Sequence, residues 1–242
     1  MTGVELSVGA LAGRTGRGVR VAVVDSGIHA AHPHVRGIAG GVAVGDDGPV
    51  SLDVVDRLGH GTAVAAAIRE KAPDASIIAV KVFDRSLRTS ARALAAAIRW
   101  AAAQRAALIN LSLGTTNPDH EGMLAGAVSD AAARGAIVIA AAPEGENVWL
   151  PGALPGVVGV ELDWTCARDA CLVRTRPDGT VRIAASGFPR PIPGVSPEQN
   201  LQGLSFAVAN ATGLIAVALE GHAAGSTAEL LERLGAVSSR TE

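Results

Sequence analysis

The sequence predicts an α/β fold in which a mostly parallel central sheet is flanked by helices on both faces. Three observations carry this prediction. Short β-branched segments alternate with alanine-rich segments of helical length, which is the pattern of parallel strands joined by crossover helices. The predicted strands are apolar and bounded by glycines, as strands in a buried sheet are. The composition, with 48% hydrophobic and 18% charged residues, is that of a folded globular chain.

The elements follow one another in a regular order. The first strand covers residues 19–24, and a helix after His60-Gly61-Thr62 runs from Ala63 to about Lys71, where Pro73 ends it. Further strands are predicted over 76–82, 107–113, 136–141 and 157–161, and further helices over 91–104, 123–134, 205–220 and 227–234. The segment 171–185 differs, because Asp178-Gly179 between two short β-like runs indicates a hairpin.

Length, charge and hydropathy limit the domain count and the partners. The 242 residues contain no repeat and no linker, so we expect a single domain over residues 1–242. A net charge of −2 gives no reason to expect nucleic acid as a partner. No apolar run reaches the roughly 20 residues of a membrane span, so no membrane partner is expected. Neither a signal nor a prodomain precedes the first strand, which predicts a cytoplasmic location, or a secreted one if such segments have been removed.

Three residues carry the chemistry of nucleophilic acyl transfer. Asp25 ends the first predicted strand, His60 opens one helix and Ser205 opens another. In open parallel sheets, ligands bind outside the carboxyl ends of the strands, which is where Asp25 falls. A serine is a weak nucleophile unless an imidazole takes its proton, and the imidazole needs a carboxylate that fixes its tautomer. The simpler alternative for Ser205 is that it only caps its helix.

Five segments resemble motifs of the subtilisin-like (S8) serine peptidases, in the order in which that family has them. Val21 to Ile28 is similar to the aspartate motif, Gly59 to Ala65 to the histidine motif, and Gly203-Leu204-Ser205-Phe206-Ala207 to the serine motif. The segments 109–114 and 150–158 are similar to two motifs without a triad residue. The resemblance extends from about residue 18 to residue 213 and implies the subtilisin-like three-layer fold.

The resemblance also implies the activity and the site. Asp25, His60 and Ser205 would form the catalytic triad of a serine endopeptidase, acting on a peptide or protein substrate. The segment Ser112-Leu113-Gly114 would pair with the substrate backbone as an added strand and wall the pocket for its primary side chain. We expect no cofactor and no metal, because the segment between Ile68 and Ser76 is too short for the calcium loop of the family. Nothing in the sequence predicts the oligomeric state.

The sequence departs from the family at the oxyanion hole. There the fourth strand should run into Ala-Ala-Gly-Asn, whose asparagine is the side-chain donor. Without a gap Glu144 takes that place, and with a gap the donor is deleted. Asn147 can serve only if the loop folds back. Loss of one such donor lowers the rate about 10²–10³-fold, which predicts a slow or specialised enzyme, for example one that matures a peptide. Two alternatives remain: a pseudopeptidase that binds peptides, and an enzyme that transfers the acyl group to an amine in ligation or cyclisation.

Two further groups of residues, three histidines and two cysteines, have simple structural explanations. His29, His32 and His34 could suggest a metal site, but the family commonly has a His-Pro pair here, so a surface loop is the preferred interpretation. Cys166 and Cys171 lie too far from other potential zinc ligands in the sequence. They are either reduced thiols or one local disulfide, and the sequence does not decide between the two.

Overall fold

The computed structural model describes residues 3–143, 148–176 and 180–238 of the chain. Its strands are β1 (Gly3–Ser7), β2 (Arg20–Asp25), β3 (Gly41–Gly45), β4 (Gly48–Ser51), β5 (Ser76–Lys81), β6 (Leu108–Leu111), β7 (Ile137–Ala141), β8 (Val158–Leu162), β9 (Ala170–Thr175) and β10 (Val181–Ala185). Its helices are α1 (His60–Lys71), α2 (Ala91–Ala103), α3 (Glu121–Ala132), α4 (Leu204–Ala218) and α5 (Thr227–Ser238), with short 3-10 turns at Pro118–His120 and Pro197–Gln199.

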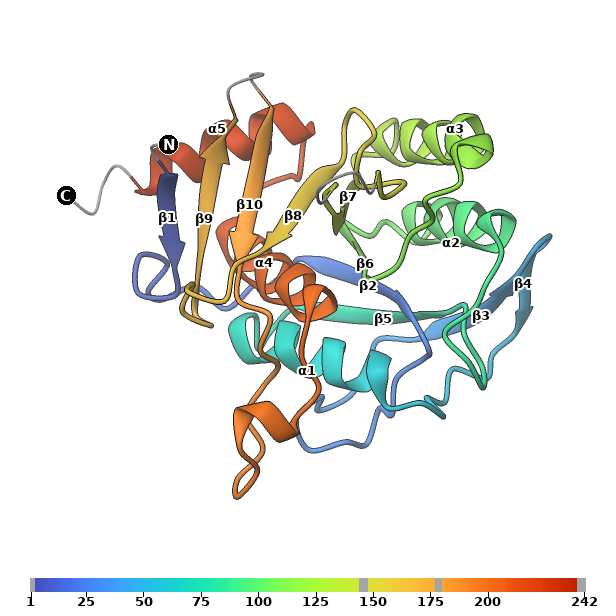
Figure 1. Ribbon diagram of the computed structural model, residues 1–242, viewed down its shortest axis with the longest axis horizontal. Helices are drawn as coiled ribbons and strands as arrows, with labels where there is room; N and C mark the ends of the chain where they lie inside the picture. The colour runs from blue at the N-terminus through green and yellow to red at the C-terminus, as the bar shows by residue number, and fades with distance from the viewer. Residues whose placement is uncertain (1–2, 144–147, 177–179, 239–242) are drawn as a thin grey trace.

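The described strands form one sheet in the order β1-β9-β10-β8-β7-β6-β2-β5-β3-β4 (Figure 1). The centre of the sheet is parallel and consists of β3, β5, β2, β6, β7, β8 and β10. Antiparallel pairs lie at the two edges, where β4 pairs with β3 and β9 pairs with β10 and β1. The predicted mostly parallel sheet is therefore confirmed. The predicted hairpin corresponds to β9 and β10, although its Asp178-Gly179 turn lies outside the described residues.

Helices cover both faces of the sheet, as predicted. One apolar core packs α1, α4 and α5 against one face, and a second packs α2 and α3 against the other. Helix α4 is buried from Phe206 to Ala218, because a helix that is apolar all round belongs inside a protein. Its burial brings the start of the helix, and with it Ser205, to the edge where β2 and β6 end.

Three strands at or next to the sheet edges, β1, β3 and β4, were not predicted. β1 exposes Val4 on one side. β3 is only five residues long with a glycine at each end, and β4 carries Pro49, which is tolerated at a sheet edge. Their short, weakly apolar sequences carry little strand signal. That residues 1–242 form a single domain stays a prediction. None of the described helices combines the length and hydropathy that a membrane span requires.

Candidate active site

Asp25 and His60 lie in direct contact at the carboxyl end of β2. Nδ1 of His60 lies 2.8 Å from Oδ1 and 3.0 Å from Oδ2 of Asp25. The carboxylate is 1% exposed and also accepts a 2.7 Å hydrogen bond from the backbone N–H of Ser26. Because an ionised carboxylate only accepts hydrogen bonds, it holds a proton on Nδ1 of His60 and leaves Nε2 free to accept one.

The close approach of α1 to β2 requires Gly61. A Cβ atom at this position would lie 2.2 Å from the carbonyl oxygen of Gly27 and 3.1 Å from the Cβ of Asp25, which no side chain could occupy. The backbone N–H of Gly61 donates instead to Oγ of Ser26 at 2.9 Å. A glycine directly after His60 is thus what allows the imidazole to reach Asp25.

The pKa of His60 is set by two opposing effects. Burial by itself favours the neutral imidazole, but the hydrogen bond and the negative charge of Asp25, together with the charge of Asp56, outweigh it and raise the pKa above 6.5. The imidazole is therefore a better proton acceptor than a free histidine. This is the property that a general base requires.

Asp56, which the sequence analysis missed, organises the start of α1. Its Oδ1 accepts hydrogen bonds from Oγ of Ser26 and from the N–H groups of Leu58 and Gly59, at 2.8–2.9 Å. Its Oδ2 accepts from the N–H and the hydroxyl of Thr62 at 2.8 and 2.6 Å. Burial alone would raise the pKa of this carboxyl, but these donors lower it below 3.8. An ionised Asp56 thus holds the loop that carries His60.

Ser205 lies in the first turn of α4, next to Phe206. The helix begins after Gly203, whose φ of 130° favours glycine, and no side chain caps it. The alternative that Ser205 merely caps its helix is therefore wrong. Its Oγ donates to the carbonyl oxygen of Ser112 at 3.4 Å, and the ring of the next residue, Phe206, lies with its centroid 5.9 Å from that of His60. Among the described residues, no hydrogen bond joins Ser205 to His60.

The segment Ser112-Leu113-Gly114 follows β6 and borders a pocket beside Ser205. This pocket has a volume of about 160 Å³ and is lined by Ser112, Leu113, Gly114, Ala141, Trp149, Leu204, Ser205 and Val208. None of these side chains is charged. Trp149, which the sequence analysis did not single out, stands against Gly114. The two predicted oxyanion residues, Glu144 and Asn147, lie outside the described residues.

The comparison with a family model decides the identity of the fold. Residues 16–236 match the model of the subtilase family. The chain belongs to this family. The predicted S8 resemblance is thereby confirmed, and the match covers all the elements that carry the site.

Relatives with known names agree with this assignment. The subtilase is 31% identical over 238 residues to subtilisin E of Bacillus subtilis, a match that covers 91% of this chain and 57% of that protein. It is 36% identical over 162 residues to the minor extracellular protease Epr of the same organism, which covers 62% of this chain and 24% of Epr. The chain thus spans between a quarter and just over half of the length of these relatives.

A solved structure shows the same fold. The crystal structure of the nisin leader peptidase NisP from Lactococcus lactis has a TM-score of 0.65 and 20% identity to the subtilase, covering 88% of this chain and 80% of NisP. At this identity the likeness concerns the fold alone.

Asn210 holds the loop that leads into Ser205. Its side-chain amide donates to the carbonyl oxygens of Ser186 and Phe188 at 2.8 and 3.0 Å, while the N–H of Gly203 donates to the carbonyl oxygen of Gly187 at 2.9 Å. These bonds close the loop 187–203 at its base. The sequence analysis offered no role for this fully buried residue, since its partners lie more than twenty positions away.

The histidines and cysteines form no metal site among the described residues. His29, His32 and His34 lie in the loop after β2 and border a large cavity, so the interpretation as loop residues fits better than that of a metal site. Cys166 and Cys171 are both free thiols. Burial raises the pKa of Cys166 to about 11 and that of Cys171 to about 12, so neither is a thiolate at neutral pH.

Proposed function

We propose that this subtilase is a serine endopeptidase in which Ser205 is the nucleophile, His60 the general base and Asp25 the residue that orients His60. The observation that carries the proposal is the 2.8 Å contact between Nδ1 of His60 and Oδ1 of Asp25, next to the first turn of α4. In this arrangement Nε2 of His60 is the free proton acceptor, as the chemistry of a triad requires.

The reaction begins with a rotation of the Ser205 side chain away from the carbonyl oxygen of Ser112 and toward His60. Oγ then attacks the peptide carbonyl while His60 takes its proton. The imidazolium, stabilised by Asp25, protonates the leaving nitrogen, and water resolves the acyl-enzyme with His60 again as base. The backbone N–H of Ser205, at the positive end of α4, supports the developing oxyanion. Asn147, or Glu144 in its protonated form, remains the candidate for the second donor.

The pocket beside Ser205 favours an uncharged side chain in the residue before the cleaved bond. Its described lining carries no charge with which a lysine or a glutamate could pair, and burying an unpaired charge is costly. The volume of about 160 Å³ compares with the engineered cavity of about 150 Å³ that holds benzene. We therefore infer a preference for aliphatic residues and phenylalanine, with Ser112-Leu113-Gly114 pairing with the substrate backbone.

The specialised role that we propose is the maturation of a peptide. Its support is the altered oxyanion segment around Glu144, which suits a slow, selective enzyme better than a digestive one. NisP, which shares the fold, is named a leader peptidase, and such an activity would fit the proposed role. A cytoplasmic location stays a prediction. The relative Epr is named an extracellular protease, which is the opposite location.

The test is labelling with a fluorophosphonate, which reacts only with an activated serine. We expect the wild-type chain to be labelled and Ser205→Ala not to be, with His60→Ala strongly reduced. Circular dichroism and thermal unfolding of each variant serve as the folding control. A folded wild-type chain that stays unlabelled would refute the peptidase and favour the peptide-binding alternative. Mass spectrometry of the products with and without an added amine then distinguishes hydrolysis from ligation.

A further inference from the structure

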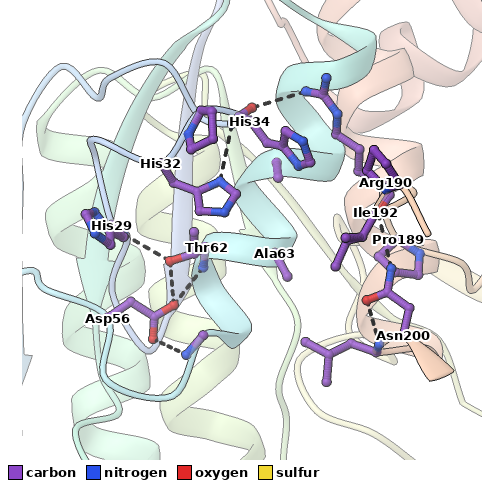
Figure 2. Close-up of a pocket in the computed structure, with 15 residues that line it drawn as sticks. His29, His32, His34, Asp56, Thr62, Ala63, Pro189, Arg190, Ile192 and Asn200 are labelled. Carbon is purple, nitrogen blue, oxygen red and sulfur yellow. Dashed lines mark hydrogen bonds between the residues drawn. The ribbon is translucent and has the colours of Figure 1, made fainter. Parts of the chain in front are cut away.

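A second cavity lies against the start of α1, next to the loop that carries His60. Its volume is about 450 Å³, within the range of small-molecule and peptide side-chain sites. Figure 2 shows it between the loop after β2, with His32 and His34, and the loop before α4, with Pro189 and Ile192. Its floor is the first half of α1. The two cavities have no lining residue in common.

The walls of this cavity are preformed. Nη1 of Arg190 donates to the carbonyl oxygen of His34 at 3.4 Å, and Nδ2 of Asn200 donates to the carbonyl oxygen of Arg190 at 3.3 Å. The two loops are thus tied to each other across the top of α1 (Figure 2). Pro189 and Pro193 fix the backbone of one wall. A site that exists before its occupant arrives loses less entropy on binding.

The cavity is placed to receive the part of a substrate that leaves after cleavage. Gly59 and Ala63, which line it, flank His60 along α1, and its other wall, the loop 187–203, runs directly into Ser205. In the proposed function the acyl part of the substrate occupies the pocket at Ser112-Leu113-Gly114. His60 then protonates the leaving nitrogen, so the chain beyond that nitrogen passes His60 and continues toward this cavity.

The apolar lining selects an apolar side chain. Ile192 and Leu201 line the cavity and yet remain 45% and 48% exposed, while Ala63, Ala66 and Pro189 form its interior. Covering exposed aliphatic surface of this kind with a leucine-sized side chain is favourable.

The rim selects a negative charge beside that side chain. The guanidinium of Arg190 and the imidazoles of His32 and His34 lie along it. Asp56 is the acidic residue of the described lining, and both its oxygens are occupied by the donors that hold the His60 loop. The charge of Asp56 is thus partly compensated by its own hydrogen-bond donors, whereas the guanidinium of Arg190 at the rim suits a carboxylate well.

We propose that this cavity recognises the leaving segment of the substrate, taking an apolar residue followed by an aspartate or glutamate on the carboxyl side of the cleaved bond. The proposal rests on the proposed function for the direction of the chain. It adds selectivity on the leaving side to the selectivity for an uncharged residue on the acyl side.

The test measures binding without catalysis. Dye-labelled peptides share Ala-Ala-Pro-Leu before the bond and carry Ala-Leu-Glu, Ala-Leu-Gln or Ala-Ser-Gln after it, and fluorescence anisotropy gives their affinity for the Ser205→Ala chain. We expect the Leu-Glu peptide to bind at least tenfold more tightly than the Ser-Gln peptide. In the Ser205→Ala chain, the further change Arg190→Gln should remove the difference in affinity between the Leu-Glu and Leu-Gln peptides. The further change Ile192→Glu should remove the higher affinity of both of these peptides over the Ser-Gln peptide.

Val195→Glu is the matched control. Val195 lies in the same loop and is 38% exposed, but it does not line the cavity, so the preference should survive this change. Equal affinity for the three peptides, no binding of any, or an equal loss in Val195→Glu and Ile192→Glu overturns the proposal. Fluorophosphonate labelling of the wild-type chain reports separately on the proposed function. A chain that is not labelled can still bind the peptides selectively, and a chain that is labelled can lack this selectivity.

Discussion

The imidazole of His60 is held by the carboxylate of Asp25, with Nδ1 lying 2.8 Å from Oδ1. The contact joins two residues 35 positions apart, and it is made where β2 ends and α1 begins. It determines both the orientation and the basicity of the ring.

The first prediction concerns the dependence of activity on pH. Protonated His60 cannot accept the proton of Ser205, so kcat/KM should rise with pH through the pKa of His60, and this midpoint should lie above 6.5. In Asp25→Asn the raising effect of the carboxylate is lost, so the midpoint should move down, while kcat falls about 10⁴-fold as in other triads. Rates of hydrolysis of a peptide anilide from pH 5 to 9 measure both. An unshifted midpoint would show that Asp25 does not set the basicity of His60.

The second prediction concerns Asp56 and stability. Asp56→Ala removes an acceptor that satisfies five donors at the start of α1 and should cost about 1–2 kcal/mol of the free energy of unfolding. Because the folded pKa of Asp56 is lowered, its contribution is present above pH 3.8 and is lost as the pH falls through the folded pKa. Urea unfolding at pH 7 and pH 3 should therefore show a smaller difference from wild type in acid. Asp47→Ala, at a side chain that is 90% exposed, is the control.

The third prediction concerns Asn210. Asn210→Ala leaves the carbonyl oxygens of Ser186 and Phe188 without their donor in a buried place, which should cost about 1–3 kcal/mol of stability. Because these bonds close the loop that leads into Ser205, the rate of fluorophosphonate labelling should also fall at temperatures where the variant is fully folded. Gln104→Ala, at an exposed position just after α2, is expected to change neither quantity. Lower stability with an unchanged labelling rate would limit Asn210 to a structural role.

The sequence allowed the fold and the Asp25–His60 contact to be predicted because both depend on local signals. Strands and helices of the sheet core have strong apolar patterns, and the motifs around residues 25 and 60 place each side chain at the end of an element. The structure joins these two residues, while their catalytic role and that of Ser205 remain proposals. Boundaries shifted by one to four residues, the largest shifts being at the start of α1 and the end of α5, since helix and strand ends depend on tertiary contacts.

Two kinds of residue were missed: Asp56, whose partners lie mostly within six residues, and residues whose partners lie far away in the sequence. Asp56 looks like any loop aspartate until the start of α1 folds onto it, and Asn210 looks like a helix residue until Ser186 and Phe188 pass beside it. Arg190 and Ile192 gain their meaning only from the loop after β2, more than 150 positions earlier. Strands such as β3, which lies next to the edge strand β4, escaped prediction because their pairing, and not their composition, makes them strands.

The fourth prediction concerns Trp149 and the residue before the cleaved bond. Trp149→Ala should enlarge the pocket beside Ser205, so the ratio of kcat/KM for a tryptophan substrate to that for a leucine substrate should rise about tenfold. Competition between two such peptides, followed by mass spectrometry, measures this ratio directly. Val148→Ala alters the adjacent exposed residue, which is absent from the pocket lining, and should leave the ratio unchanged. A ratio equally unchanged in Trp149→Ala would remove this tryptophan from the specificity pocket.

The last prediction concerns Glu144, which the ungapped alignment pairs with the asparagine donor of the family's oxyanion hole. If the ungapped alignment is correct, an ionised Glu144 repels the developing oxyanion, and Glu144→Asn supplies a neutral donor in its place. We then expect kcat to rise by up to about 10²–10³-fold with KM little changed, because the interaction exists only in the transition state. Glu146→Asn, two residues further along, makes the same change of charge without restoring the donor. A similar increase in both variants would point to a general effect of charge on the loop, and no increase in either would assign the second donor to another residue.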